Sequence, residues 1–116
     1  MIDQFSRIRL TFGSQNMQIL NSSRVIVFGI GGVGGYAVEA LVRSGIGAVD
    51  IVDSDVVSLT NLNRQLYALH STLDMLKVDA AEKRILDINP QCKVTKHNVF
   101  LQKKILPCLI FQNMTI

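Results

Sequence analysis

Residues 24–34 read RVIVFGIGGVG, an apolar, β-branched run that continues into four closely spaced glycines. The run up to Gly29 is typical of a strand buried on both faces of a parallel sheet. From residue 33 the apolar spacing predicts a helix that ends at Ser44, because Gly45 suits the left-handed position that follows a helix. The apolar face of this helix is predicted to contain Val33, Ala37, Ala40 and Leu41.

A second strand is predicted at residues 48–53 and ends in the acid Asp53. Strand, glycine turn, helix and strand therefore fit within residues 24–53, the length of one βαβ unit with parallel strands and a right-handed crossover. We predict an α/β fold: a Rossmann-like, three-layer αβα domain with a mostly parallel sheet.

The remaining segments are read outward from this unit. Residues 54–76 are polar and irregular, with at most a helical turn over residues 61–68, and a short helix is expected over residues 15–20. A long helix is predicted over residues 77–89, followed by a third strand over residues 93–98. The apolar face of that long helix is predicted to contain Val78, Ala81, Ile85 and Ile88.

The predicted domain organisation has three parts. Residues 1–22 form a helical lead-in, residues 23–100 the nucleotide-binding domain and residues 101–116 a divergent tail. The composition, with 48% hydrophobic and 18% charged residues and two cysteines, fits one globular domain and excludes a disordered chain or a disulfide scaffold. Cys92 and Cys108 form no CxxC motif, so we expect reduced thiols and no metal site.

Charge and hydropathy bear on location and partners. The uncharged stretch from Val25 to Val38 is too short for a membrane span, and the charged N-terminus does not fit a signal peptide, so we expect a cytoplasmic protein. Residues 1–87 hold eight bases and nine acids, whereas four lysines and no acid follow Asp87. A basic tail can contact nucleic acid, although a solvated surface is the commoner role.

The glycines satisfy the pattern GxGxxG between a predicted strand and a predicted helix, the context in which this motif binds nucleotides. The glycines allow a sharp turn and a close approach to phosphate, and the helix start attracts anions. Asp53 follows Gly34 by nineteen residues, where a carboxylate can accept hydrogen bonds from ribose hydroxyls. This unit alone leaves NAD, FAD and ATP open.

A second group of polar residues separates these nucleotides. If residues 61–65 form a helical turn, Asn61 and Arg64 share a face, and Lys77 follows at the start of the next helix. Arginine and lysine could hold a triphosphate whose sugar binds Asp53, whereas a dehydrogenase has no need for them. The alternative is a polar surface loop with a solvated lysine.

Five spaced motifs resemble the ThiF/MoeB/HesA superfamily of adenylating enzymes, which are related to ubiquitin-activating enzymes. The motifs are residues 28–34 (FGIGGVG), 39–47 (EALVRSGIG), 53–55 (DSD), 61–65 (NLNRQ) and Lys77. Within the superfamily, residues 5–7 (FSR), 43–47 (RSGIG) and 88–90 (INP) are most similar to the tRNA threonylcarbamoyladenosine dehydratase branch. The likeness covers residues 5–98.

This resemblance implies a set of roles. ATP would lie on the turn, with Asn61, Arg64 and Lys77 at its phosphates and Asp53 at its ribose. The residues implied for the turn and in support of binding are Gly29, Gly31, Gly32, Gly34, Asp55 and Gln65. Arg7 would reach the ATP of a neighbouring subunit, so the active form would be a homodimer with Arg7, Arg64 and Lys77 as catalytic residues. His70 and His97 match no family motif.

The implied reaction is adenylation. The carboxylate of a threonylcarbamoyl group on tRNA would attack the α-phosphate, pyrophosphate would leave, and the acyl adenylate would cyclise with loss of AMP. Three alternatives remain: adenylation of a ubiquitin-like sulfur-carrier protein, a nucleotide-binding module without catalysis and, ranked last, an NAD-dependent oxidoreductase.

The chain also departs from the superfamily pattern. Members are longer and use ATP with Mg²⁺, which is held by an aspartate after a further strand, whereas this sequence has no acid after Asp87. Residues 101–116 resemble nothing in the family. We therefore expect the chain to act as the N-terminal part of an adenylating domain that binds nucleotide weakly and turns it over little by itself.

Overall fold

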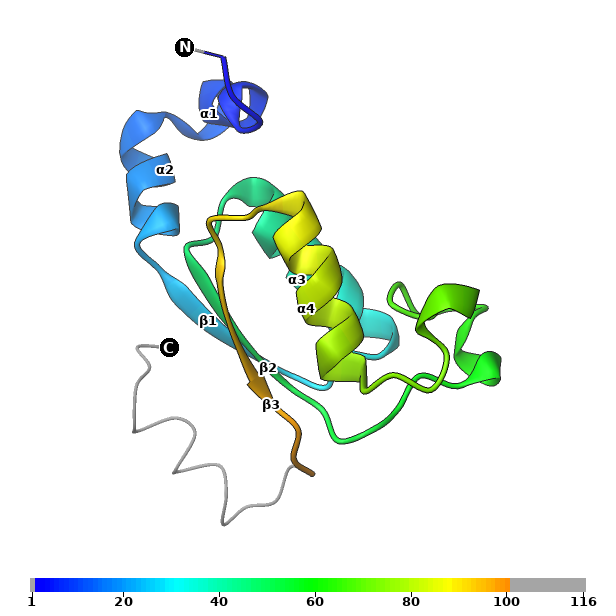
Figure 1. Ribbon diagram of the computed structural model, residues 1–116. Helices are drawn as coiled ribbons and strands as arrows, with labels where there is room; N and C mark the ends of the chain where they lie inside the picture. The colour runs from blue at the N-terminus through cyan, green and yellow to red at the C-terminus, as the bar shows by residue number, and fades with distance from the viewer. Residues whose placement is uncertain (1, 101–116) are drawn as a thin grey trace.

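The computed structural model describes residues 2–100, which form a three-stranded sheet with two long helices packed against it (Figure 1). The helices and strands, in chain order, are α1 (Ser6–Phe12), α2 (Ser14–Asn21), β1 (Arg24–Phe28), α3 (Gly32–Ser44), β2 (Ala48–Val52), α4 (Lys77–Ile88) and β3 (Lys93–His97). Two short 3₁₀ turns, Leu59–Asn61 and His70–Thr72, lie between β2 and α4. The α/β class is confirmed.

The sheet has the order β1-β2-β3, and all pairs are parallel. Phe28 pairs with Val52, and Val52 pairs with His97, so the three strands end level with one another. Because parallel strands share one carboxyl edge, the segments after β1, β2 and β3 start side by side. This edge is where ligands bind in open α/β sheets.

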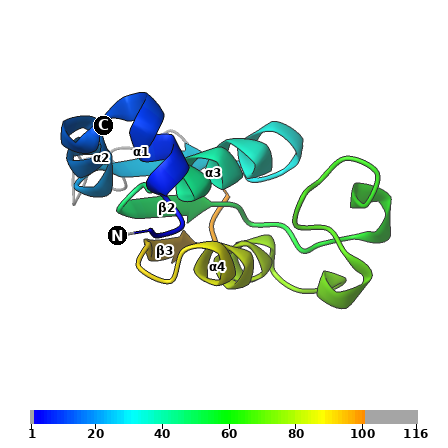
Figure 2. The same cartoon turned by 90° about the horizontal axis from the view of Figure 1, so that it is seen from above.

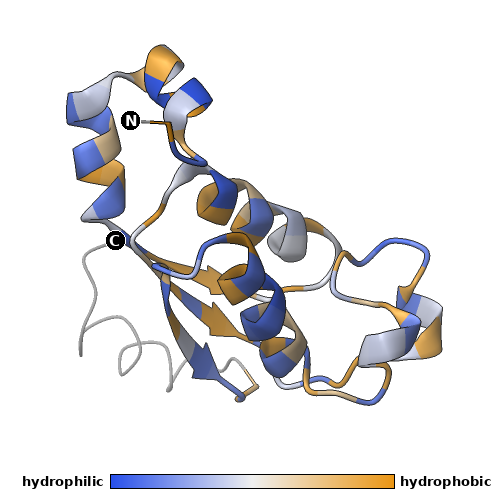
Figure 3. Ribbon diagram, turned by 45° about the horizontal axis from the view of Figure 1, so that its top comes forward, coloured by the Kyte–Doolittle hydropathy of each residue, from blue (hydrophilic) through white to orange (hydrophobic). Residues whose placement is uncertain are grey.

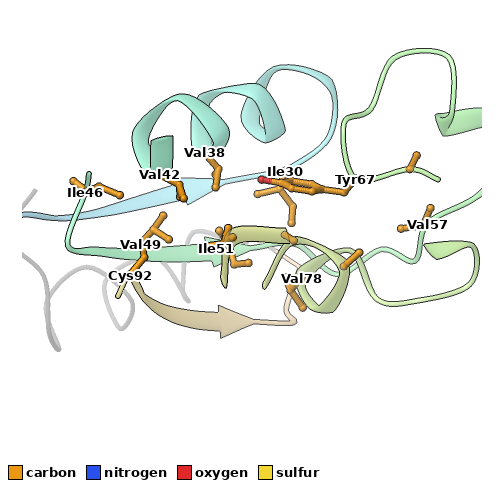
Figure 4. Packing of buried hydrophobic residues seen from close by; sticks show 14 residues of the cluster. Ile30, Val38, Val42, Ile46, Val49, Ile51, Val57, Tyr67, Val78 and Cys92 are labelled. Carbon is orange, nitrogen blue, oxygen red and sulfur yellow. The ribbon is translucent and has the colours of Figure 1, made fainter. Parts of the chain in front are cut away.

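The apolar core lies between the sheet and the pair α3 and α4 (Figure 4). Val49 and Ile51 on β2 are fully buried beneath Val38 and Val42 of α3. Helix α4 contributes the face predicted from the sequence: Val78, Ala81 and Ile85 are buried, and Ile88 packs at the margin. Cys92 is a buried free thiol, as predicted, whereas Cys108 lies outside the described residues.

The predicted apolar face of α3 is wrong at three of its four positions, since only Leu41 packs against the core. Val33 is 88% exposed, and Ala37 and Ala40 are exposed as well, whereas the helix buries Gly35, Val38 and Val42. Two apolar stripes run along this helix, and the period alone cannot tell which one faces the sheet. Tertiary packing selects the stripe that contains Gly35, where the absence of a side chain leaves room for the buried Tyr67 ring.

The prediction that β1 is buried on both faces also needs correction. All five of its residues are partly exposed in the described part of the chain. The face of the sheet opposite α3 and α4 carries a polar network in which Arg24 and His97 both contact the buried carboxylate of Asp50, at 2.6 and 2.8 Å. Strand β3 is largely hydrophilic (Figure 3), because Val94 is the one apolar residue among its five.

Outside the core, the predicted elements agree closely with the structure. The expected helix over residues 15–20 is α2, while α1 was not predicted, and the predicted third strand ends one residue earlier, at His97. Residues 54–76 are irregular as expected, with two 3₁₀ turns and, as predicted, a helical turn at residues 61–65, where the amides of Arg64 and Gln65 donate to the Asn61 carbonyl oxygen at 3.2 and 2.9 Å. This connection extends away from the sheet and helices (Figure 2). The predicted tail, residues 101–116, lies outside the described residues.

Candidate functional site

The glycine turn after β1 is held tightly against the sheet. Gly29 adopts a φ of +78°, a left-handed conformation that favours glycine, and its amide donates to the carbonyl oxygen of Val52 at 2.8 Å. A Cβ atom added to Gly34 would lie 1.7 Å from the carbonyl oxygen of Gly29. The third glycine of the motif therefore lets α3 pack directly on the turn.

The N-terminus of α3 presents unshielded backbone amides. No side chain caps this 13-residue helix, and no acidic residue occupies its first turn. A Cβ atom added to Gly32 would meet nothing within 4 Å, so the backbone is open on that side. Uncapped N–H groups and the helix dipole together favour an anion here, which fits the phosphates of a nucleotide.

Asp53 joins the glycine turn to the end of β2. Its carboxylate accepts hydrogen bonds from the amides of Ile30, at 3.1 Å, and of Asp55, at 2.9 Å. Its own amide donates to the carbonyl oxygen of His97 at 3.1 Å, which ties it to the end of β3. Both carboxylate oxygens keep a further lone pair for a ligand hydroxyl.

A hollow of about 170 Å³ opens beside Asp53 at the carboxyl edge of the sheet. Its described lining consists of Gly29, Val52, Asp53, Ser54, Asp55, Val99 and Phe100. Val99 and Phe100 could not be identified from the sequence as site residues, because they follow the third strand without a motif. A hollow with polar side chains and two apolar side chains, Val99 and Phe100, can receive the base and the ribose hydroxyls of a nucleoside.

The connection between β2 and α4 folds back onto the glycine turn through two side chains. The amide nitrogen of Gln65 lies 3.3 Å from the position that a Cβ atom on Gly31 would take. The buried Tyr67 ring packs against Gly35, and its hydroxyl donates to the Gly35 carbonyl oxygen at 3.3 Å. Burial raises the pKa of Tyr67, so the hydroxyl remains a neutral donor. Figure 4 shows Tyr67 close to Ile30.

Asn61 and Arg64 have separate partners in the structure. The buried Asn61 accepts hydrogen bonds from the amide and hydroxyl of Ser58, at 2.9 and 3.0 Å, and so stabilises the first 3₁₀ turn. The exposed Arg64 guanidinium donates to the carbonyl oxygen of Thr60 and to the Asn63 side chain, at 2.9 and 3.1 Å. Arg64 therefore bonds within its own loop rather than to the glycine turn.

Lys77 begins α4 and is buried along its length, with 8% of its side chain exposed. Its amide donates to the carbonyl oxygen of Asp55 at 3.0 Å, and its ammonium lies 3.7 Å from the Asp55 carboxylate. Val56, which follows Asp55, and Leu76, which precedes Lys77, pair as an isolated antiparallel bridge. The start of α4 is thereby fixed next to the hollow.

Arg7 is far from these groups within its own chain. It is exposed on α1, which lies beyond the amino ends of the strands, whereas the glycine turn lies at their carboxyl ends (Figure 1). The predicted phosphate contact of Arg7 therefore cannot be made within one chain.

The described residues contain no group of three or more histidine, cysteine or acidic side chains that could hold a metal ion. Asp55 is a single exposed carboxylate and does not make a magnesium site by itself. Within residues 2–100, no helix is long and apolar enough to cross a membrane.

Sequence reasoning missed two structural supports of this site. Tyr67 gave no signal because a buried aromatic residue in an irregular loop fits no periodic pattern. The network of Arg24, Asp50 and His97 could have been suspected from the acid at the centre of an apolar strand.

The chain was compared with known proteins. The family model described as "ThiF family" matches residues 5–114, so the expectation that residues 101–116 resemble nothing in the family is wrong for residues 101–114. The tRNA threonylcarbamoyladenosine dehydratase of Bacillus subtilis is 50% identical over 100 residues, which are 86% of this chain and 39% of that protein. The adenylyltransferase and sulfurtransferase uba4 of Ogataea parapolymorpha is 41% identical over 90 residues, 78% of this chain and 23% of that protein.

Among solved structures, the fold is similar to the Escherichia coli tRNA N6-threonylcarbamoyladenosine dehydratase in complex with ATP. The TM-score is 0.93 at 35% sequence identity, and the match covers 96% of this chain and 46% of that one. The chain thus spans less than half the length of the relatives it matches.

Proposed function

The chain belongs to the ThiF family, and on this premise we propose that residues 23–100 form a nucleotide-binding domain that binds ATP for the adenylation of a carboxylate. The observation that carries the proposal is the position of Asp53, whose carboxylate bonds to the glycine turn and borders the hollow. The bound ATP of the Escherichia coli relative supports the choice of nucleotide.

In the proposed reaction, a carboxylate oxygen of the substrate forms a bond to the α-phosphorus of ATP. The bond from that phosphorus to the bridging oxygen breaks, and pyrophosphate leaves. The chain contributes positioning and charge: the amides at the start of α3 and the Lys77 ammonium face the phosphates, and Asp53 holds the ribose. Gly29, Gly31, Gly32 and Gly34 form the turn, and Gln65 supports it.

The phosphate contacts proposed for Asn61 and Arg64 require a change of partner. The Asn61 amide group must reach the ligand while its oxygen stays on Ser58, and Arg64 must release Thr60 and Asn63. Arg64 is exposed, so it can rotate without disturbing the core.

For the substrate we propose the threonylcarbamoyl group of a modified tRNA, followed by cyclisation with loss of AMP. The 50% identity to the Bacillus subtilis dehydratase supports this choice. The second candidate is the C-terminus of a ubiquitin-like sulfur carrier, which the 41% identity to uba4 favours.

Arg7 completes the proposed site from a neighbouring subunit in a cytoplasmic homodimer. Its distance from the glycine turn within one chain supports a contact in trans. Sedimentation at micromolar concentration tests this assembly, and a strictly monomeric species would leave Arg7 without a phosphate to contact.

Calorimetric titration of the chain with ATP and with NAD tests the choice of nucleotide. ATP is expected to bind more tightly, and tighter binding of NAD would overturn the adenylation proposal. Pyrophosphate–ATP exchange with threonylcarbamoylated tRNA or a sulfur carrier then separates the two substrates. We expect little exchange from the 116-residue chain by itself, because residues 2–100 contain no cluster of three or more histidine, cysteine or acidic side chains to hold magnesium.

A further inference from the structure

Lys77 and Asp55 form an ion pair beside the hollow, and their side chains differ in exposure and in freedom to move. The Lys77 side chain is 8% exposed, so the residues packed around it restrict its movement. The Asp55 side chain is 70% exposed, and its carboxylate lies 3.7 Å from the ammonium, beyond hydrogen-bond distance. The cation is therefore restricted, whereas the carboxylate can turn into solvent.

The backbone holds Asp55 at the nucleotide site. Its amide donates to the Asp53 carboxylate at 2.9 Å, and its side chain borders the same hollow as Asp53 and Gly29. Because the Asp55 carboxylate lies 3.7 Å from the Lys77 ammonium, a phosphate that reaches Lys77 also approaches the Asp55 carboxylate. Like charges at such a distance repel one another.

We propose that Asp55 is a residue that sets affinity for phosphates: its carboxylate neutralises Lys77 until a phosphate replaces it. A buried ammonium needs a counter-charge, which Asp55 supplies at the cost of competing with the ligand. Binding of polyphosphate exchanges one anion for another at Lys77, and the displaced carboxylate turns toward solvent. This inference rests on the proposed function and concerns how the same site selects its ligand.

The exchange favours ligands with high negative charge. A polyphosphate competes effectively against one exposed carboxylate, whereas a neutral nucleoside gains nothing from the exchange. Asp55 therefore weakens the binding of ATP without changing that of adenosine, and it raises the concentration of ATP needed for binding.

The test compares Asp55→Asn with Asp87→Asn in the full 116-residue chain. Both changes remove one negative charge. Asp87 lies ten residues along α4 from Lys77, about 15 Å away, so salt largely screens the interaction between the two charges. Calorimetric titrations use ATP, inorganic pyrophosphate and adenosine, each with EDTA and with magnesium, and thermal unfolding confirms that both variants fold.

Asp55→Asn is expected to bind ATP and pyrophosphate about threefold more tightly than the parent chain, with the same affinity for adenosine. Asp87→Asn is expected to bind all three ligands like the parent chain. Equal or weaker ATP binding by Asp55→Asn would overturn the proposal. If Asp55→Asn binds ATP more weakly than the parent chain in magnesium but not in EDTA, the proposal is overturned as well, because Asp55 is then a metal ligand.

The pyrophosphate titration separates this inference from the proposed function. If neither chain binds ATP but Asp55→Asn binds pyrophosphate more tightly than the parent chain, the proposed role of Asp55 is supported and the adenylation proposal is contradicted. No pyrophosphate binding by either chain would show that Lys77 is not a phosphate site, and would overturn the proposed role of Asp55.

Discussion

The two halves of the candidate site are held in place by different groups. In the first half, the glycine turn and Asp53 are fixed by backbone amides and carbonyls of three strands. In the second half, the side chains of Asn61, Arg64 and Lys77 bond to residues of their own connection. The first half is preorganised for a ligand, whereas the second must exchange partners when one binds.

This difference predicts where mutations act. Changes in the first half should lower the free energy of unfolding, because its groups also hold the sheet edge together. In the second half, a change of the exposed Arg64 should alter nucleotide affinity with little effect on stability, whereas Asn61 and Lys77 are buried.

The largest effect is expected from Gly34→Ala. Its Cβ would lie 1.7 Å from the Gly29 carbonyl oxygen, and backbone on both sides prevents an easy shift. We expect the free energy of unfolding to fall by about 4 kcal/mol or more, measured by urea denaturation. Gly32→Ala is the matched control, since its Cβ meets nothing within 4 Å. Equal stability of the two variants would contradict the close packing of α3 on the turn.

Asp50→Asn is expected to destabilise the chain by about 3 kcal/mol, because it breaks a buried ion pair. Asp50 reaches the site through His97, whose side chain it contacts and whose carbonyl oxygen receives the Asp53 amide. Urea denaturation at neutral pH measures the change. A loss below 1 kcal/mol would mean that the hydrogen bonds alone, without the charge, hold the network.

The same carboxyl predicts a dependence of stability on pH. Burial alone would raise the pKa of Asp50, but hydrogen bonds from Arg24 and His97 outweigh it, so the pKa lies below the ordinary 3.8. The folded state then binds fewer protons than the unfolded one, and stability is full above pH 3.8 and falls as the pH drops through the folded pKa. Denaturation from pH 6 down to about pH 2 should show a shallower fall below pH 3.8 in Asp50→Asn than in the parent chain.

Asp53→Asn should have a smaller effect on stability and a large one on binding. An amide group supplies one acceptor oxygen where the carboxylate serves two backbone amides, so we expect a loss of about 1 kcal/mol. ATP affinity should fall by about tenfold through loss of an acceptor for ribose. Parallel denaturation and titration measure both effects, and unchanged affinity would remove Asp53 from the site.

Arg64→Ala should leave stability nearly unchanged, because the exposed guanidinium bonds within its own loop. It should weaken ATP more than AMP, by about tenfold for ATP, since its proposed partners are the outer phosphates. Titration with both nucleotides checks this. An equal loss for ATP and AMP would place Arg64 elsewhere than at those phosphates.

The sequence predicted the first half of the site more fully than the second. Glycines and an acid at fixed spacing around a strand have few structural solutions, so Gly29, Gly34 and Asp53 were found together. The connection over residues 54–76 has no period, and its side chains can bond in many ways. The partners of Asn61, Arg64 and Lys77 therefore emerged only from the structure.

By itself, the sequence determined the βαβ unit, the parallel strands, the glycine turn and the family, because local conformation and short-range spacing carry that information. Tertiary structure alone decided that α3 buries Val38 and Val42 rather than Val33 and Ala37, and that Asp50 pairs across three strands. It also decided that the Asp55 carboxylate lies 3.7 Å from the Lys77 ammonium. Such choices depend on packing and charge between segments distant in sequence, to which no local pattern is sensitive.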